Sequence, residues 1–195
     1  MTIIICPGIH EPELTESFIA ECLNPATDIT INGIAVDILT FPGEGILALS
    51  GFHILQFLHD NFDRRRHRLS NKLESPVIFI SFSAGVIGAI IAATKWQVLG
   101  GHVKAFIAID GWGVPLWGNF PIHRLSHDYF THWSSAILSS GEDNFYADPS
   151  VDHLSMWRSP QTVQGHWVDQ SIGCSQPQNR LNAAEFLHLL LKHYE

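Results

Sequence analysis

Short apolar runs alternate with segments of helical apolar spacing along most of this chain. Runs of β-branched and aromatic residues, typical of buried strands, lie at residues 2–6, 29–41, 77–82 and 103–110. Apolar residues recur with helical spacing at residues 13–23, 54–62, 85–93 and 181–194. The Asn32-Gly33 pair could bend the second strand or turn it into a hairpin. Strands that alternate with helices predict a mostly parallel sheet with helices on both faces.

The later half of the chain has a less regular pattern. We expect a short strand at 121–128, a helix at 131–138, a last strand at 144–148, a helix at 160–168 and a loop at 169–179. The chain has 195 residues, of which 46% are hydrophobic and 15% charged, which is enough apolar material for one packed core. We therefore predict a single three-layer α/β domain over residues 1–195.

The segment Ser81-Phe82-Ser83-Ala84-Gly85 lies between a strand-like run and a helical pattern. A serine flanked by small residues at such a junction is typical of a nucleophile elbow, G-x-S-x-G, in which a strained turn exposes the serine oxygen. Small neighbours are needed because the helix backbone passes close to the strand. Here Ser81 takes the place of the first glycine. The sequence predicts that Ser83 is a nucleophile.

A serine hydroxyl is a weak nucleophile until a histidine accepts its proton, and a carboxylate must orient that histidine. With twelve histidines in the chain, position along the sequence has to decide. His153 follows the expected strand at 144–148 and precedes Pro160, which is suited to begin a helix. We predict His153 as the base, with His166, His127 and His132 as alternatives.

The carboxylate is expected between the serine and the histidine in the chain. Asp128 ends the first strand-like segment after the run at 103–110, so it should reach the same edge of the sheet as Ser83. Asp143, which would suit a pairing with His166, and Asp110 are the alternatives. We predict Asp128 as the acid.

Two backbone N–H groups are expected to bind the oxyanion that forms when a serine attacks an acyl group. The first should belong to Ala84, directly after the nucleophile. The second should come from the turn Pro7-Gly8-Ile9-His10 after the first strand, with Ile9 as the donor.

Charge and cysteine content narrow the classes of partner. The formal net charge of −8 argues against nucleic acid, since phosphate binding needs a basic surface. Three cysteines without metal-site spacing, Cys6, Cys22 and Cys174, fit reduced thiols in a cytoplasmic protein. No apolar run reaches the length of a membrane span.

Histidines are dense enough to raise the question of a metal. His123, His127, Asp128 and His132 lie within ten residues, and helical spacing would bring several of them to one face. Pro121 and the alternation that follows it favour a strand, which would direct these side chains to different sides. We expect no metal site and no cofactor.

Taken together, the turn after the first strand, the elbow at Ser83, and an Asp128 and His153 in that order resemble the α/β-hydrolase superfamily, in a small form without a cap domain. The resemblance covers residues 2–168, with the elbow as its specific part. It implies a serine hydrolase that acts on a carboxylic ester, thioester or similar acyl bond of a small molecule. The segment from Asp110 to Pro121 is too short for a lid domain.

The resemblance also implies an acyl pocket, for which Trp112, Trp117 and Phe120 are candidate walls. Two other functions stay open at this point: a non-catalytic binding protein with the same fold, and an acyltransferase in which an alcohol or amine replaces water. The oligomeric state is not readable from the sequence.

Overall fold

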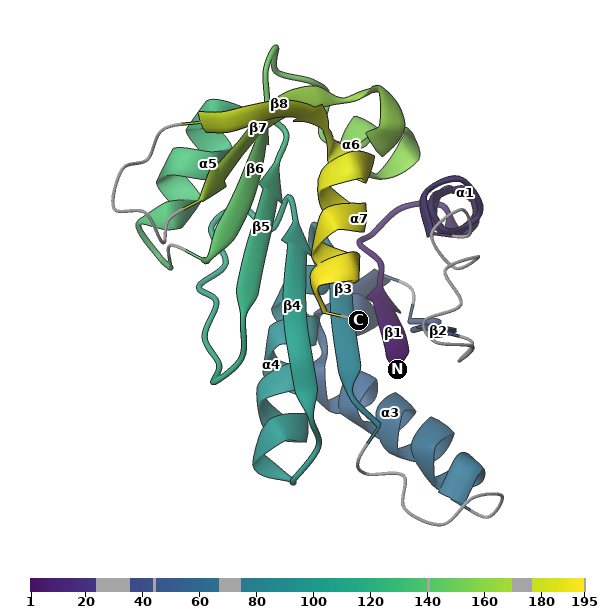
Figure 1. Ribbon diagram of the computed structural model, residues 1–195. Coiled ribbons are helices and arrows are strands. Elements are labelled where there is room, and N and C mark those ends of the chain that lie inside the picture. Colours follow the sequence, from purple (N-terminus) through teal and green to yellow (C-terminus); the bar gives the residue numbers. More distant parts are fainter. Residues whose placement is uncertain (24–35, 44, 67–74, 140, 170–176, 195) are drawn as a thin grey trace.

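The computed structural model describes residues 1–23, 36–43, 45–66, 75–139, 141–169 and 177–194. Its centre is an eight-stranded sheet in the order β2-β1-β3-β4-β5-β6-β7-β8 (Figure 1). The first six strands in this order run parallel, and β7 and β8 each pair antiparallel with their predecessor. The predicted mostly parallel sheet is confirmed.

The strands are β1 (Thr2–Cys6), β2 (Asp37–Thr40), β3 (Val77–Phe82), β4 (Val103–Ile109), β5 (Ile122–Ser126), β6 (Asp143–Ala147), β7 (Gln164–Asp169) and β8 (Pro177–Asn182). The α-helices are α1 (Pro12–Phe18), α3 (Gly51–Arg66), α4 (Gly85–Val98), α5 (Tyr129–Ala136), α6 (Ser155–Arg158) and α7 (Ala183–His193). A π-helical turn, Ile19–Leu23, continues α1, and short 3₁₀ turns lie at Gly45–Leu49 and Pro160–Thr162.

Side chains of the parallel strands alternate between two cores, as the period of two of a strand requires. Ile3 and Ile5 point into a core that is covered by α1, α6 and α7, whereas Ile4 and Cys6 point into a core under α3 and α4. Both faces of the sheet are therefore buried, which confirms the three-layer α/β architecture.

Three of the expected elements differ from the structure. The segment 160–168 forms a 3₁₀ turn and then strand β7, because the Gly165–Val168 backbone pairs with β6. The strand at 143–147 is consequently not the last one, and β8 replaces part of the loop expected at 169–179. In the run 29–41, β2 comprises Asp37–Thr40, while the proposed bend at Asn32-Gly33 lies outside the described residues.

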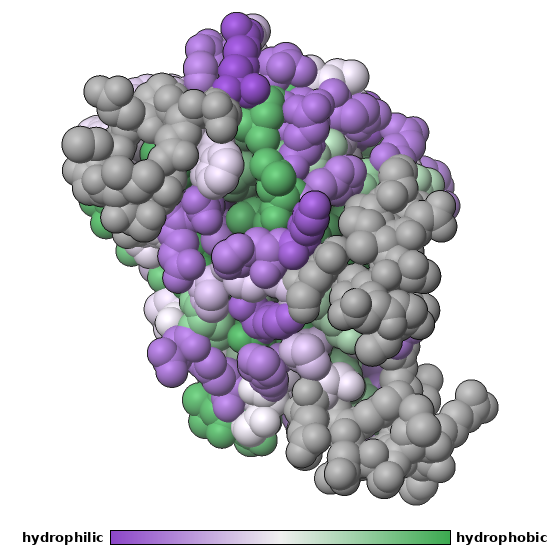
Figure 2. Space-filling model, in the orientation of Figure 1, coloured by the Kyte–Doolittle hydropathy of each residue, from purple (hydrophilic) through white to green (hydrophobic). Residues whose placement is uncertain are grey.

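The face shown in Figure 2 carries polar side chains over most of its described surface. Within the described residues, no helix is both long and apolar enough to cross a membrane. Because β3 and β4 are parallel neighbours, residues that follow them meet at one edge of the sheet, and the candidate site lies there.

Candidate active site

Ser83 lies on a strained turn between β3 and α4. Its φ of 52° is in the left-handed region, which non-glycine residues rarely adopt. The Ser83 N–H donates to the carbonyl of Ile109 at the end of β4 over 2.9 Å, and the Val86 N–H donates to the Ser83 carbonyl over 3.2 Å. These bonds hold the turn of the expected elbow between strand and helix.

Small residues around Ser83 allow the chain after β1 to pass close to the elbow. A Cβ on Gly85 would lie 2.2 Å from the Pro7 carbonyl oxygen, and one on Gly8 would lie 3.0 Å from the Cβ of Ser83. Ser81, in the position of the first elbow glycine, is fully buried, and its hydroxyl donates to the Ile107 carbonyl over 3.2 Å. A serine is accommodated there because a carbonyl of the neighbouring strand accepts a hydrogen bond from its hydroxyl.

His153 reaches Ser83 from the loop that precedes α6. Its Nε2 lies 2.9 Å from the Ser83 Oγ, and its Nδ1 lies 2.7 Å from the Asp110 Oδ2. An ionised carboxylate can only accept, so Nδ1 carries the hydrogen and Nε2 is left to accept from the serine hydroxyl. The structure thus brings the predicted Ser83 and His153 together.

Asp110 takes the position that we predicted for Asp128. Asp110 directly follows β4, has a φ of 54°, and is buried. Asp128 is the N-cap of α5, where its Oδ1 accepts from the Thr131 N–H over 2.6 Å. The prediction of Asp128 as partner of His153 is wrong, because helix capping fixes its carboxylate and Asp110 makes the contact.

A second histidine contacts the same carboxylate. The Nδ1 of His127 lies 2.9 Å from Oδ1 and 2.8 Å from Oδ2 of Asp110, and the His127 backbone N–H donates to Oδ1 over 2.9 Å. The carbonyl of His127 accepts from the Val151 N–H, which ties it to the loop that carries His153. His127 was expected only as an alternative base, and its contact with Asp110 was not predicted.

The electrostatics of this group follow from burial and hydrogen bonding. Burial by itself would raise the pKa of Asp110, but the hydrogen bonds from His127 and His153 outweigh it, so the pKa is lowered and the carboxylate stays ionised. The hydrogen bond to Asp110 raises the pKa of His127, with smaller contributions from the charges of Asp128 and Asp152. Asp110 therefore carries a negative charge held by three N–H donors, two from imidazole rings and one from the His127 backbone.

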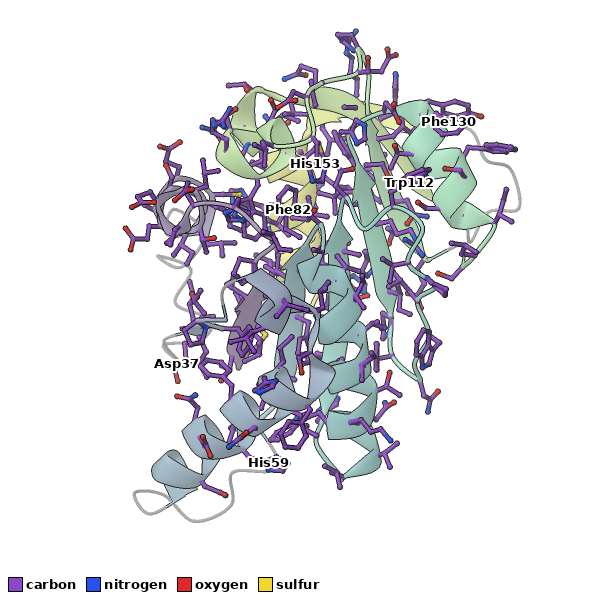
Figure 3. All side chains as sticks on the ribbon, turned by 180° about the vertical axis from the view of Figure 1, so that it is seen from behind. Asp37, His59, Phe82, Trp112, Phe130 and His153 are labelled. Atoms are coloured by element: carbon purple, nitrogen blue, oxygen red, sulfur yellow. The ribbon has the colours of Figure 1, made fainter. Side chains whose placement is uncertain are left out.

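Aromatic rings fix the orientation of His153. Its imidazole stacks on Phe82 at a centroid distance of 4.8 Å, Phe82 stacks on Trp157 at 5.0 Å, and Trp157 stacks on Phe18 at 3.8 Å. Figure 3 shows His153 directly above Phe82 in that view. The rings of His153, Phe82, Trp157 and Phe18 form an aromatic column from the site into the core on the side of α1.

Ser83 and His153 open into a cavity of about 460 Å³. Its polar wall consists of the residues described above, including His127 and Asp128, and its apolar wall consists of Ile87, Trp112, Val114 and Phe130. Of the three aromatic residues that we expected to line an acyl pocket, only Trp112 does so. Phe120 is buried in the core under α3 and α4, and Trp117 is exposed outside the cavity lining.

The two expected oxyanion donors, Ala84 and Ile9, line different cavities. Ala84 follows Ser83 and lines the same cavity. Ile9 belongs to the turn whose Gly8 packs on Ser83, but its side chain lines a neighbouring cavity of about 370 Å³. No backbone carbonyl of the described residues accepts a hydrogen bond from the Ile9 or Ala84 N–H. Whether the two groups bind an oxyanion stays a prediction.

The alternative residues lie elsewhere. His166, on β7, pairs with Asp148 at 3.1 Å, and Asp143 accepts from the Trp167 indole N–H at 2.8 Å, so His166 and Asp143 are not partners. His132 is buried in α5, where burial lowers its pKa.

A scan against protein-family models gives no match for this chain, and a search of curated proteins finds none with significant sequence similarity.

The histidines considered for a metal do not converge. His123 lies in β5, where its Nε2 is 2.7 Å from the Tyr194 hydroxyl, away from His132 in α5. A different group, Asp110, His127 and His153, has ligand-type atoms within 4.8 Å of one another. The imidazole nitrogens lie 2.7 to 2.9 Å from the Asp110 carboxylate oxygens, which is the length of N–H···O hydrogen bonds. The group is therefore two imidazoles that donate to one carboxylate.

Proposed function

We propose that this protein is a serine hydrolase that cleaves a carboxylic ester, a thioester or a similar acyl bond of a small molecule. The observation that carries the proposal is the continuous hydrogen-bonded chain from Ser83 through His153 to the ionised Asp110, at the edge of an open cavity. A nucleophile, a base and an orienting carboxylate in this order are what acyl transfer through serine requires.

In the proposed mechanism, the Ser83 Oγ attacks the acyl carbon while its proton passes to the Nε2 of His153. Asp110 stabilises the resulting imidazolium through the proton on Nδ1. The N–H groups of Ala84 and Ile9 donate to the oxyanion. His153 then gives its proton to the departing alcohol or thiol, which leaves an acyl-serine. Water, deprotonated by the same histidine, hydrolyses the acyl-serine and restores the hydroxyl.

The strained turn supports this assignment. A left-handed φ at Ser83 is unfavourable for a non-glycine residue, and such strain is retained mainly where surrounding structure imposes it for a purpose. The proposal is supported by the contacts of Ser83 and His153, which are those expected from the resemblance to α/β-hydrolases, with Asp110 in place of Asp128. We also infer a cytoplasmic protein without nucleic-acid partners, a view supported by the free, buried Cys6 and Cys22 and the net charge of −8.

A fluorophosphonate probe, which labels activated serines, tests the proposal. We expect labelling of the wild type, none of Ser83→Ala, and a rate lowered by at least about 10³-fold for His153→Ala. His166→Ala is the matched control, because His166 also pairs with an aspartate but lies outside the cavity lining. If the folded wild type does not react with the probe, the serine-hydrolase assignment is wrong, and a non-catalytic binding function is favoured.

A further inference from the structure

Helix α5 has a polar buried face and an apolar exposed face, the reverse of an ordinary surface helix. Its buried side chains, Thr131, His132 and Ser135, are polar. Its outward side chains are large and apolar: Tyr129, Phe130, Trp133 and the C-cap Ile137 are 61%, 59%, 53% and 70% exposed. Residues at these spacings share one face of a helix. Burial of apolar area drives folding, so a helix with this arrangement indicates that its outer face meets something other than water.

The apolar face of α5 is continuous with the proposed active site. Trp112, 61% exposed, donates its indole N–H to the Ser134 hydroxyl over 2.9 Å and so is fastened to α5. Trp112 and Phe130 both line the cavity that contains Ser83. In Figure 3, Phe130 extends from α5 and Trp112 lies between it and His153. The exposed surface and the apolar wall of the cavity are one surface.

The charges near this surface are of both signs: Arg180 donates to the Asp148 carbonyl over 3.4 Å, and Arg124 donates to the carbonyls of Val114 and Ser139. No lysine or arginine occurs between Tyr129 and Leu138, and Asp128 and Asp148 line a cavity of about 380 Å³ beside Tyr129 and Phe130. Recognition of anionic lipids uses clusters of several lysines or arginines, and α5 carries none. Tryptophan and tyrosine, with an apolar body and a polar tip, are the residues preferred where a protein meets an uncharged lipid interface.

We propose that Tyr129, Phe130, Trp133, Ile137 and Trp112 form a docking surface for an uncharged or zwitterionic lipid surface, from which an ester enters the Ser83 cavity. A lipid surface is favoured over a protein because a protein bound to Phe130 and Trp112 would cover the cavity mouth. A lipid surface supplies the ligand through the same opening. The docking half of this proposal is independent of catalysis, and the substrate half rests on the proposed function.

Vesicle co-sedimentation of the full chain tests the docking half. The parent is Ser83→Ala, which has no nucleophile, mixed with phosphatidylcholine vesicles. We expect binding, and a partition coefficient lowered at least about tenfold by adding Trp133→Ser or Ile137→Ser. The matched control is Phe52→Ser on α3, which removes a 71% exposed aromatic ring from another surface and should not change the partition coefficient. Circular dichroism confirms that each variant is folded.

Several outcomes would overturn the docking surface. The first is that the Ser83→Ala parent does not bind phosphatidylcholine vesicles. The second is that the variants with Trp133→Ser or Ile137→Ser have the same partition coefficient as the parent. A dimer that Trp133→Ser dissociates, without vesicle binding, would assign the face to a second copy of the chain. Because binding is measured without the nucleophile, this result is separate from fluorophosphonate labelling. In a protein that keeps Ser83, Trp133→Ser should also slow the hydrolysis of a long-chain ester embedded in the vesicles at least about tenfold. An unchanged rate would refute the proposal that the substrate enters from the lipid surface.

Discussion

Replacement of Asp110 by asparagine is the sharpest perturbation of the proposed mechanism. The Asp110 Oδ1 accepts a hydrogen bond from the His127 backbone N–H, and a backbone N–H can only donate. An asparagine must therefore keep its carbonyl oxygen at the Oδ1 position and place its NH₂ at the Oδ2 position, 2.7 Å from the His153 Nδ1. The amide then donates to Nδ1, which moves the imidazole hydrogen to Nε2.

In that tautomer, His153 donates toward Ser83 and has no lone pair to accept the serine proton. Loss of the correct tautomer in a serine–histidine–aspartate arrangement lowers turnover by about 10⁴-fold, or roughly 5 kcal/mol of transition-state stabilisation. We expect a fall of this size in the rate of fluorophosphonate labelling for Asp110→Asn. The rate is measured with excess probe by mass spectrometry, and a urea melt shows that the variant is folded.

Asp128→Asn is the matched control. It removes a carboxylate that lines the same cavity but preserves helix capping, since asparagine and aspartate cap equally well. We expect its labelling rate to stay within about threefold of the wild type, because an exchange without loss of the cap is worth under 1 kcal/mol. If Asp110→Asn labels within tenfold of the wild type, or if Asp128→Asn falls as far, the assignment of the acid is incorrect.

Three further outcomes are expected. Gly85→Ala should lower the free energy of unfolding by about 1–3 kcal/mol in urea, since its Cβ would meet the Pro7 carbonyl; an unchanged midpoint would contradict the close packing. The raised pKa of His127 means that its contribution to stability is complete below pH 6.5 and is lost as pH rises through the raised value. His127→Asn should therefore destabilise by about 1–2 kcal/mol at pH 6 and less at pH 9, and the opposite order in paired urea melts would refute the sign. Burial raises the pKa of Cys22 to about 12, so peptide mapping after thiol labelling at pH 8 should show it protected in the folded protein; modification as fast as in urea would disprove the burial.

The strained turn at Ser83 could be predicted because local pattern determines it. A buried strand, a serine among small residues and an apolar helix follow each other without interruption, so the turn at Ser83 is encoded within about fifteen residues. His153 was also found, from its place after a strand. Its contact with Ser83 spans 70 residues and depends on tertiary packing.

The partner of His153 was predicted only as an alternative. Asp110 directly follows β4, and nothing in the local sequence indicates the left-handed φ that turns the chain there and places its carboxylate at His153. Aspartate is among the preferred N-cap residues, and a helix begins at Tyr129, directly after Asp128. Reading that signal as a cap would have removed Asp128 from consideration. Strand β7 was not predicted because Pro160 suggested a helix start, and the segment is a strand through its pairing with β6 and β8.

The aromatic column has a consequence for the order in which the molecule folds. His153 rests on Phe82, which belongs to the elbow strand, and Trp157 joins the column to Phe18 and donates its indole N–H to Thr15 over 3.4 Å, across 142 residues of chain. Contacts this distant in sequence close late, because the entropy of the intervening loop must first be overcome. The serine turn can form early from neighbouring residues, but His153 is aligned with Ser83 only once α1 and α6 have docked against each other. Ser83 would then react with a fluorophosphonate only in the completely folded chain, and partly folded forms would not be labelled.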